Sequence, residues 1–267
     1  MKRILITGAG GEIGRALRAG LYGCYPLLRL LDIAPQEAAR TGEELLSADI
    51  TGLGAMRGAL EDVDCVVHLA GLPRENTWET ILPNNIVGTY NVFEAARLQR
   101  VKRVIFASSN HAVGYHRASR KIDTDVLPRP DSRYGVSKVF GEALGRMYAD
   151  KYGLNVACLR IGSFREKPQD ARQLSTWISP RDTVQLVRRC IDAPAYHYLI
   201  VYGVSANTRS RWINPNADFL GYQPQDNAED FAAVLAGKTA PARDPATEFH
   251  GGAFCALEFT GDASRID

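Results

Sequence analysis

The N-terminal end of the chain restricts its fold more than any other feature. A short apolar stretch, Arg3–Thr7, leads into Thr7-Gly8-Ala9-Gly10-Gly11-Glu12-Ile13-Gly14, and an amphipathic segment follows. Glycines at a strand-to-helix turn permit positive φ angles and let backbone N–H groups approach an anion, and the helix start adds partial positive charge. The spacing fits Gly-x-x-Gly-x-x-Gly and predicts a βαβ unit with a pyrophosphate site at Gly8, Gly11, Glu12, Ile13 and Gly14.

The rest of the chain repeats this alternation of short apolar runs and amphipathic stretches. We expect strands at 3–7, 27–32, 44–48, 65–69, 103–107, 155–160 and 198–202, and helices near 12–21, 52–60, 78–99, 135–151 and 180–192. Apolar runs rich in β-branched residues suit strands that are covered on both faces. The pattern predicts an α/β fold with a doubly wound, parallel (Rossmann-type) sheet of about seven strands. We expect one domain over 1–267, in which 1–162 form mainly the NAD-binding core, and 163–180 and 204–267 form mainly a small substrate-binding lobe and a tail.

The composition argues against several other classes of protein. The chain has 267 residues, 45% of them hydrophobic, and its net charge of +2 is spread along the sequence. Neither nucleic acid nor a membrane surface is therefore an expected partner, and no stretch approaches the roughly 20 apolar residues of a membrane span. The five cysteines are scattered and odd in number, which is typical of reduced thiols in a cytoplasmic protein. No cluster has the spacing of metal ligands, so no metal is expected.

An acidic residue ends the second predicted strand. A carboxylate at Asp32 is placed to bond both ribose hydroxyls and to repel a 2′-phosphate, which favours NAD over NADP. A surface acid that merely ends a strand is the alternative. Further cofactor contacts are expected where the third and fourth strands end, at Asp49, Ile50, Leu69, Ala70 and Gly71.

A tyrosine and a lysine share one face of a later predicted helix. Tyr134 and Lys138 are four residues apart, so their side chains are neighbours. The cation favours the phenolate, which predicts that the pKa of Tyr134 falls from about 10 toward neutral. A phenol of this kind is a general base for a hydroxyl proton. A solvated helix face is the alternative for the pair taken alone.

Taken in order, these motifs resemble the extended short-chain dehydrogenase/reductase superfamily. The resemblance covers about residues 1–165 and is carried by the glycine run, Asp32, His68-Leu69-Ala70-Gly71, Asn85, Ser108-Ser109 and Tyr134-x-x-x-Lys138. It implies a catalytic triad in which Ser109 holds the substrate oxygen, Tyr134 takes its proton and Lys138 also binds the nicotinamide ribose. Asn85 would brace the site, a surface asparagine being the alternative. The resemblance places Asn85, Ser108, Tyr134, Lys138 and Ile161 among the cofactor contacts.

Within this superfamily the chain is similar to the bacterial uronate dehydrogenases. The similarity rests on Phe106-Ala107-Ser108-Ser109-Asn110-His111, Leu159-Arg160-Ile161-Gly162-Ser163 and Arg172-x-Leu174-Ser175-Thr176-Trp177. It implies oxidation of C1 of cyclic D-glucuronate or D-galacturonate by NAD, giving an aldarolactone. Arg172 is suited to clamp a carboxylate with its planar guanidinium. The expected substrate contacts are Pro73, Ser109, Asn110, His111, Tyr134, Ser163 and Arg172.

One of these contacts departs from the pattern of the similar proteins. Pro73 stands where related chains can carry a hydroxyl residue. Only its backbone carbonyl can accept a hydrogen bond from the sugar, since proline has no backbone N–H and no polar side chain.

Other functions stay open at this point. A nucleotide-sugar epimerase or dehydratase would use the same fold, although about 100 residues after the sixth strand are few for a nucleotide-sugar lobe. A non-catalytic NAD-sensing module would not need the tyrosine and lysine pair. We expect a homo-oligomer, because the helix at 135–151 carries an apolar stripe that suits either core packing or a dimer face, formed by Val136, Phe140, Leu144 and Met147.

Overall fold

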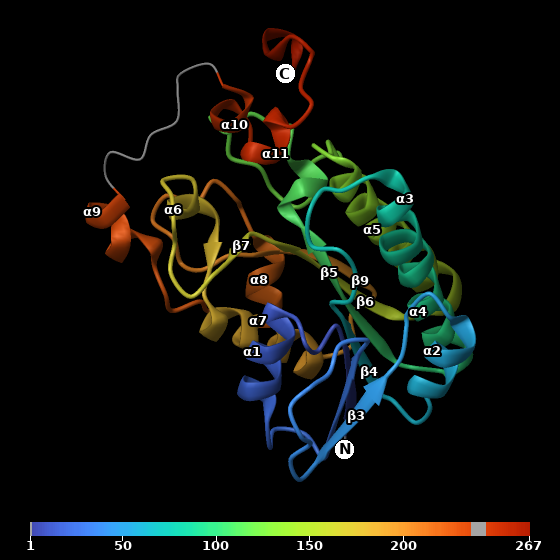
Figure 1. Ribbon diagram of the computed structural model, residues 1–267. Helices are drawn as coiled ribbons and strands as arrows, with labels where there is room; N and C mark the ends of the chain where they lie inside the picture. The colour runs from blue at the N-terminus through green and yellow to red at the C-terminus, as the bar shows by residue number, and fades with distance from the viewer. Residues whose placement is uncertain (1, 236–243) are drawn as a thin grey trace.

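The computed structural model describes residues 2–235 and 244–267, and its centre is a seven-stranded parallel sheet (Figure 1). The strand order β3-β2-β1-β4-β5-β6-β9 reverses direction at β1, as in a doubly wound sheet. The strands are β1 (Arg3–Thr7), β2 (Leu27–Asp32), β3 (Glu43–Ser47), β4 (Cys65–His68), β5 (Arg103–Ser109), β6 (Asn155–Ile161) and β9 (Tyr198–Gly203). The predicted fold class is confirmed, with each predicted strand displaced by no more than two residues at either end.

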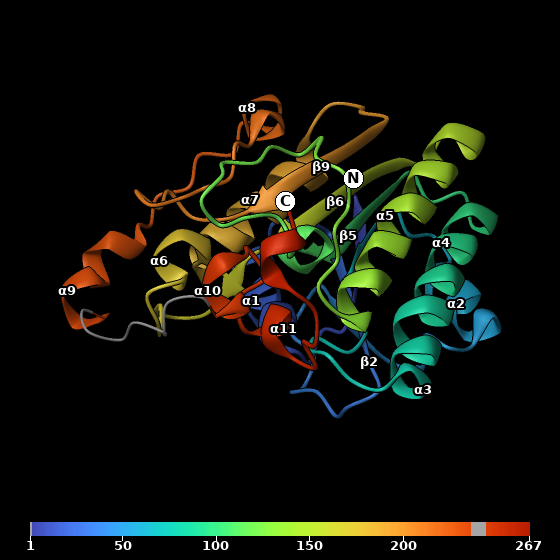
Figure 2. The ribbon, with the colours of Figure 1, turned by 90° about the horizontal axis from the view of Figure 1, so that it is seen from above.

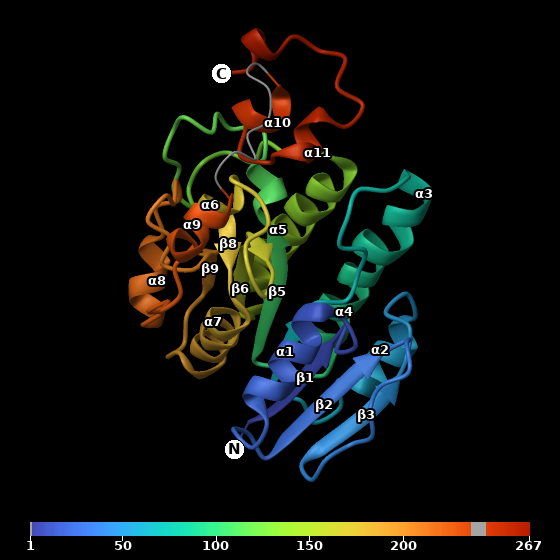
Figure 3. The ribbon, with the colours of Figure 1, turned by 60° about the vertical axis from the view of Figure 1, so that its left-hand side comes forward.

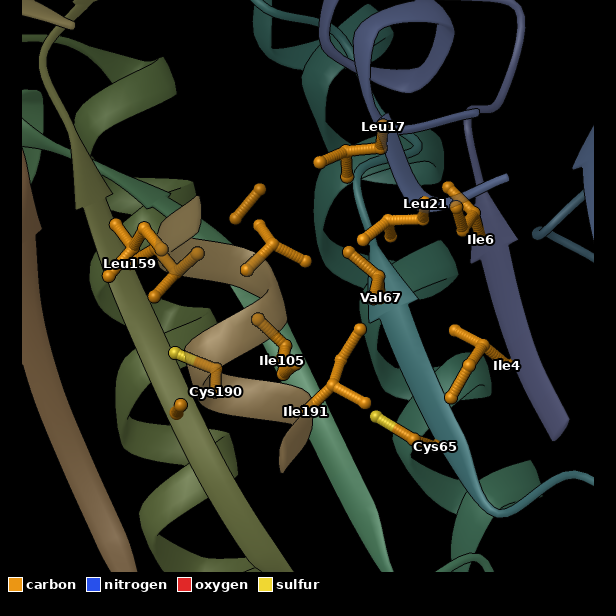
Figure 4. Packing of buried hydrophobic residues seen from close by; sticks show 14 of the residues in the cluster. Ile4, Ile6, Leu17, Leu21, Cys65, Val67, Ile105, Leu159, Cys190 and Ile191 are labelled. Carbon is orange, nitrogen blue, oxygen red and sulfur yellow. The ribbon is translucent and has the colours of Figure 1, made fainter. Parts of the chain in front are cut away.

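Helices cover both faces of the sheet, and the views of Figures 2 and 3 separate the two layers. Helices α2 (Leu53–Ala59), α4 (Gly88–Leu98) and α5 (Arg133–Tyr152) lie on one face, and α1 (Glu12–Leu21) and α7 (Pro180–Asp192) lie on the other. The side chains of β5 alternate accordingly: Val104 and Phe106 pack under the first group, and Ile105 packs under the second. Figure 4 shows Ile105 and Val67 meeting the side chains of α1 and α7. Because both faces are buried, the strands read as continuous apolar runs.

Several helices are capped by residue types that helix-end chemistry favours. Ser132 precedes α5, and its Oγ accepts the N–H of Gly135 at 3.0 Å. The same helix ends at Gly153, whose φ of +70° is easily adopted only by glycine. Ser179 caps α7 by accepting the N–H of Asp182 at 3.0 Å.

The helix predicted over 78–99 is continuous but not uniform. It consists of α3 (Trp78–Ile81), a π-helical segment η1 (Leu82–Val87) and α4. A π-helical turn widens the helix locally and is often found at functional sites. Here it contains Asn85, whose side chain is directed into the protein.

Most of the remaining elements lie at the carboxyl ends of the strands (Figure 1), whereas the helix Pro215–Leu220 packs beside α7 against the sheet. The remaining elements are η2 (Asn110–Val113), the two-stranded β7 (Ser163–Phe164) and β8 (Trp177–Ile178), α6 (Gln173–Thr176), α8 (Pro215–Leu220), η3 (Ala228–Phe231), α9 (Ala232–Leu235), α10 (Pro245–Glu248), α11 (Ala253–Ala256) and η4 (Ala263–Arg265). The predicted lobe also includes 236–243, which lie outside the described residues. None of the described helices has the length and apolar character to cross a membrane.

Candidate active site

The glycine run forms a tight turn between β1 and α1. Gly8 has a φ of +72°, and a Cβ there would lie 2.7 Å from the backbone nitrogen of Ala70. A Cβ on Gly14 would lie 2.3 Å from the carbonyl oxygen of Gly8. Only glycine fits these two positions, because the clashing atoms belong to the backbone.

The N-terminus of α1 has the features of an anion site. Gly11 precedes it and offers no side-chain cap, in contrast to the serines before α5 and α7. The first-turn N–H groups of a helix have no partner within the helix, and Gly11 and Glu12 are exposed. These backbone donors and the helix dipole fit a pyrophosphate.

Asp32 ends β2 beside this turn. Its Oδ2 accepts the N–H of Gly10 at 2.8 Å, and its Oδ1 accepts the N–H of Ala34 at 2.9 Å. The carboxylate therefore lies next to the glycine turn, as a ribose ligand should.

The other predicted cofactor positions fall along the same edge of the sheet. Ile50 is buried against Gly88, whereas Asp49 is exposed and caps the turn at Thr51. Leu69, Ala70 and Gly71 follow β4, where the N–H of Leu69 donates to the carbonyl of Thr7 at 3.1 Å.

Two predicted cofactor contacts have side chains committed to the protein interior. The Ser108 hydroxyl donates to Glu142 Oε1 at 2.6 Å, and Ile161 packs in the core under α1 and α7. The alternation of side chains along β5 explains the first case, because Ser108 and Ser109 point to opposite faces. Ser108 can therefore offer a ligand only its backbone groups.

Ser109, Tyr134 and Lys138 are brought together at the carboxyl end of β5. Ser109 is the last residue of that strand, and Tyr134 and Lys138 lie one turn apart at the start of α5. Lys138 Nζ lies 5.3 Å from the centre of the Tyr134 ring and donates to the carbonyl of Ala107 at 2.9 Å. All three residues are buried.

The prediction that the pKa of Tyr134 falls toward neutral is wrong when only the protein's own groups act on the phenol. Burial raises the pKa of Tyr134 to about 12, although its contact with the Ser109 hydroxyl acts in the opposite direction. Burial also lowers the pKa of Lys138 to about 8. Desolvation disfavours both charged forms and outweighs the attraction between them, because the ammonium is directed to a backbone carbonyl rather than to the phenol.

Asn85 connects three parts of the site. Its Oδ1 accepts the N–H of Leu72 at 2.7 Å, and its Nδ2 donates to the Leu72 carbonyl at 3.1 Å and to Ser137 Oγ at 3.1 Å. The alternative of a surface asparagine is excluded, since the residue is buried. Asn85 thus ties the loop after β4 to the helix that carries Tyr134.

A cluster of polar side chains lies beside the triad. Arg172 Nη1 is 3.5 Å from Ser163 Oγ, and its Nε and Nη2 donate to the carbonyl of His250 at 3.1 and 2.7 Å. With the Asn110 amide oriented to satisfy both its atoms, Oδ1 accepts from Arg172 Nη2 at 2.9 Å and Nδ2 donates to the Ile161 carbonyl at 3.2 Å. Burial lowers the pKa of Arg172, but a guanidinium stays charged at neutral pH. The site therefore holds a half-buried cation.

The C-terminal segment completes the site, and its part in the site was not predicted from the sequence. Phe254 stacks on the ring of His111, with centroids 4.0 Å apart, and meets Tyr134 edge-on at 6.1 Å. Arg133 forms ion pairs with Glu75 and Glu258, each at 2.8 Å. The tail is thereby held against the start of α5, and its weakly periodic sequence gives no signal of this contact.

Two further residues were missed. Asp131 Oδ2 is 2.7 Å from Nδ1 of His111, and Glu75 Oε2 accepts the N–H of Tyr134 at 2.7 Å. Both acids lie in loops without periodic pattern. Pro73, by contrast, is exposed on the loop after β4, one residue beyond the backbone that Asn85 holds.

No group of three or more His, Cys, Asp or Glu side chains that could hold a metal ion occurs in the described ranges. The polar groups that the site offers a substrate are the phenol of Tyr134, the hydroxyl of Ser109, the ammonium of Lys138 and the guanidinium of Arg172.

The fold and the site define a Rossmann-type nucleotide-dependent enzyme with a Tyr-x-x-x-Lys pair. A family model described as the NAD dependent epimerase/dehydratase family matches residues 4–185. The chain belongs to this family, and NAD is its cofactor.

Individual relatives refine the class. A uronate dehydrogenase of Pseudomonas putida is 44% identical over 254 residues, covering 94% of this chain and 95% of the relative. The crystal structure of a uronate dehydrogenase variant from Agrobacterium tumefaciens, complexed with NAD, shares 42% identity and a TM-score of 0.91, covering 96% of this chain and 97% of that one. An NAD-dependent glucose-6-phosphate dehydrogenase of Haloferax volcanii is 40% identical over 250 residues, covering 85% of this chain and 95% of the relative. These similarities confirm the prediction of an NAD-dependent oxidoreductase that resembles uronate dehydrogenases.

Proposed function

We propose that the protein oxidises the C1 hydroxyl of cyclic D-glucuronate or D-galacturonate to the aldarolactone. The observation that carries this proposal is the half-buried guanidinium of Arg172, held near Ser163 and hydrogen-bonded to Asn110, the residue that follows Ser109. A substrate with a carboxylate at one end and a reacting hydroxyl at the other matches this pairing.

NAD, when bound, accepts a hydride, and its oxidised nicotinamide carries a positive charge. We propose that the glycine turn and the start of α1 hold its pyrophosphate, that Asp32 binds the adenosine ribose, and that Lys138 binds the nicotinamide ribose. Asp49, Ile50, the segment 69–71 and the backbone at 108 and 161 would line the rest of this groove.

The protein's own groups move the proton. The Ser109 hydroxyl holds the substrate oxygen, and the Tyr134 phenolate accepts the proton from it. The pKa of about 12 that burial imposes on Tyr134 disfavours the phenolate, so a positive charge close to the ring is required to oppose desolvation. Lys138, one helical turn away, is the protein group placed to contribute.

The proposed carboxylate clamp would use the side of the Arg172 guanidinium that faces Ser163 rather than the side that contacts the tail. The carbonyl of His250 accepts two hydrogen bonds from Arg172, and Nη1 is directed to Ser163. The guanidinium has five N–H donors, so it can bind a carboxylate while keeping its contact with the tail. Asn110, His111 and the carbonyl of Pro73 would then meet sugar hydroxyls.

Turnover by the purified protein tests the reaction. With NAD, glucuronate or galacturonate should produce NADH absorbance, whereas glucose 6-phosphate, L-arabinose and UDP-glucose should not. Tyr134→Phe should lose about 10²–10⁴-fold in rate. Tyr148→Phe is the matched control, because Tyr148 is a buried tyrosine of the same helix whose hydroxyl donates to Glu94. Near-normal turnover by Tyr134→Phe would refute the mechanism, and conversion of UDP-glucose without net NADH would favour an epimerase.

The clamp has a separate test. Arg172→Ala should raise KM for the uronates and leave the KM for NAD unchanged, because the side chain lies beside the triad rather than at the glycine turn. If KM for the uronates stays the same, Arg172 has another role.

We further propose a cytoplasmic homo-oligomer. The five cysteines are all unpaired, as in a reducing compartment. On α5, Val136 and Met147 are 44% and 38% exposed, which favours a face shared between copies over core packing. Light scattering of the wild type and of Met147→Glu tests this, and a monomeric wild type would exclude it.

A further inference from the structure

A buried carboxylate that the sequence did not single out lies behind the proposed substrate pocket. The side chain of Asp131 is fully buried. Its Oδ1 accepts from Ser132 Oγ at 2.7 Å, and its Oδ2 lies 2.7 Å from His111 Nδ1. Ser132 caps the helix that begins with Arg133 and Tyr134, so Asp131 joins the loop of His111 to the base of that helix.

The carboxylate is enclosed by glycines from two distant segments. A Cβ on Gly114 or on Gly251 would lie 1.9 Å from Asp131 Oδ2. The two glycines are themselves joined, since the N–H of Gly251 donates to the carbonyl of Gly114 at 2.9 Å. A side chain at either glycine would therefore collide with the carboxylate, so the two glycines leave the space that Asp131 occupies beside the imidazole.

The contact determines which nitrogen of His111 carries hydrogen. A carboxylate accepts hydrogen bonds, so Nδ1 must be the donor, and in the neutral ring Nε2 is left as an acceptor. Stacking on Phe254 and the edge contact with Tyr134, at 5.7 Å between centroids, prevent the ring from turning. No described residue forms a hydrogen bond with Nε2.

We propose that Asp131 is a positioning residue that holds His111 in the Nδ1–H tautomer, so that Nε2 accepts a hydrogen bond from a hydroxyl of the bound sugar. The part of this proposal that concerns the hydrogen bond between His111 and the sugar rests on the proposed function. The role of Asp131 in setting the tautomer does not, because it follows from the protein's own contacts.

The tautomer can be measured without any substrate. Two-bond ¹H–¹⁵N correlation spectra at about pH 8, where an ordinary histidine is neutral, distinguish the two nitrogens of each ring. The chain has five histidines, and the His111→Asn variant assigns the relevant signals. The Nδ1–H form is expected in the wild type and the Nε2–H form in Asp131→Asn, whose amide can donate to Nδ1. An Nε2–H wild type, or an unchanged Asp131→Asn spectrum, would overturn the proposal.

Kinetics test whether the tautomer matters for the sugar. Asp131→Asn should raise KM for the uronate about tenfold, as expected for a mismatched hydrogen bond, and leave the dissociation constant of NAD unchanged. In the His111→Asn background the same substitution should have less than about a twofold effect, because Asp131 acts through that ring. Equal effects in both backgrounds would overturn the positioning role.

A matched control separates positioning from stability. Asp182 is equally buried but accepts hydrogen bonds from Ser205 Oγ at 2.7 Å and from the N–H of Gln225 at 2.8 Å, next to the lobe. Asp182→Asn should lower the melting temperature and leave KM for the uronate unchanged. A wild type that oxidises no uronate would refute the proposed function alone, since the spectra still decide the role of Asp131.

Discussion

Replacing Glu142, which lies under the proposed active site, by glutamine should lower the free energy of unfolding. Glu142 on α5 and Arg160 on β6 form a bidentate pair, with both N–O distances 2.9 Å, and their side chains are 5% and 1% exposed. Glu142 Oε1 also accepts the Ser108 hydroxyl at 2.6 Å. The glutamine would keep the shape but remove the charge, leaving the Arg160 guanidinium buried without a counterion.

The size of the effect follows from this burial. Breaking a buried pair by neutralising one partner costs about 3–5 kcal/mol, a large share of the roughly 5–15 kcal/mol that stabilises a typical domain. With a urea m-value of about 3 kcal/mol/M, the unfolding midpoint should fall by about 1–1.7 M. Removing both charges in Glu142→Leu/Arg160→Met should recover most of the loss, because well-packed apolar groups often replace a buried pair without penalty.

Urea titration followed by tryptophan fluorescence measures this prediction. Asp150→Asn is the control: Asp150 meets Arg146 at 3.2 Å and His197 at 2.6 Å on the solvent-exposed side of the same helix. Loss of these exposed contacts should leave the midpoint unchanged. A Glu142→Gln midpoint within about 0.3 M of the wild type would correspond to less than about 1 kcal/mol. That result would refute the reasoning, because it would mean that the guanidinium is solvated or finds another partner.

Three more results are expected. Burial acts to raise the pKa of Glu43, but hydrogen bonds from Arg18 and Arg40 outweigh burial and lower the pKa to about 2. The contribution of Glu43 to stability should therefore be present above about pH 4.5 and be lost toward pH 2. Urea midpoints of Glu43→Gln should vary less with pH over that range than those of the wild type. Gly8→Ala should abolish NAD binding or folding, because the added Cβ would meet the Ala70 nitrogen at 2.7 Å; calorimetric titration with normal NAD affinity would contradict this. Asp32→Ala should weaken NAD and relax discrimination against NADP, and parallel titrations with both cofactors check it.

The sequence was most informative where local chemistry alone determines structure. Gly8 and Gly14 were predicted correctly as a tight turn, because backbone clashes at these positions admit no side chain. The strands were predicted because burial on both faces makes them continuously apolar. The caps at Ser132, Ser179 and Gly153 lie where helix-end chemistry places such residues.

The sequence failed where properties depend on distant segments. Spacing alone placed Lys138 next to Tyr134, but it gave no measure of their desolvation, so the direction of the tyrosine pKa was predicted wrongly. Phe254 belongs to a segment without periodic pattern, and its importance follows only from a tail that returns to the loop after β5. Asp131 also lies in a segment without periodic pattern, and besides His111 it meets Gly251 of the tail. Contacts across more than one hundred residues leave no local signature in either segment.

The loop after β5 shows how the fold controls the proposed chemistry. The hydroxyl of Ser108 is held by its hydrogen bond to Glu142, and the ring of His111 is held by its contact with Asp131. The two residues between these anchors, Ser109 and Asn110, are those that face the Tyr134 phenol and the Arg172 guanidinium. Since both anchors are buried carboxylates that accept hydrogen bonds, a shift of the intervening pair would break a hydrogen bond to a carboxylate in a low-dielectric interior, which is costly. Rigidity at this strand end therefore comes from carboxylates buried on either side of the site. Weakening either of them should lower turnover by more than it lowers the affinity for NAD.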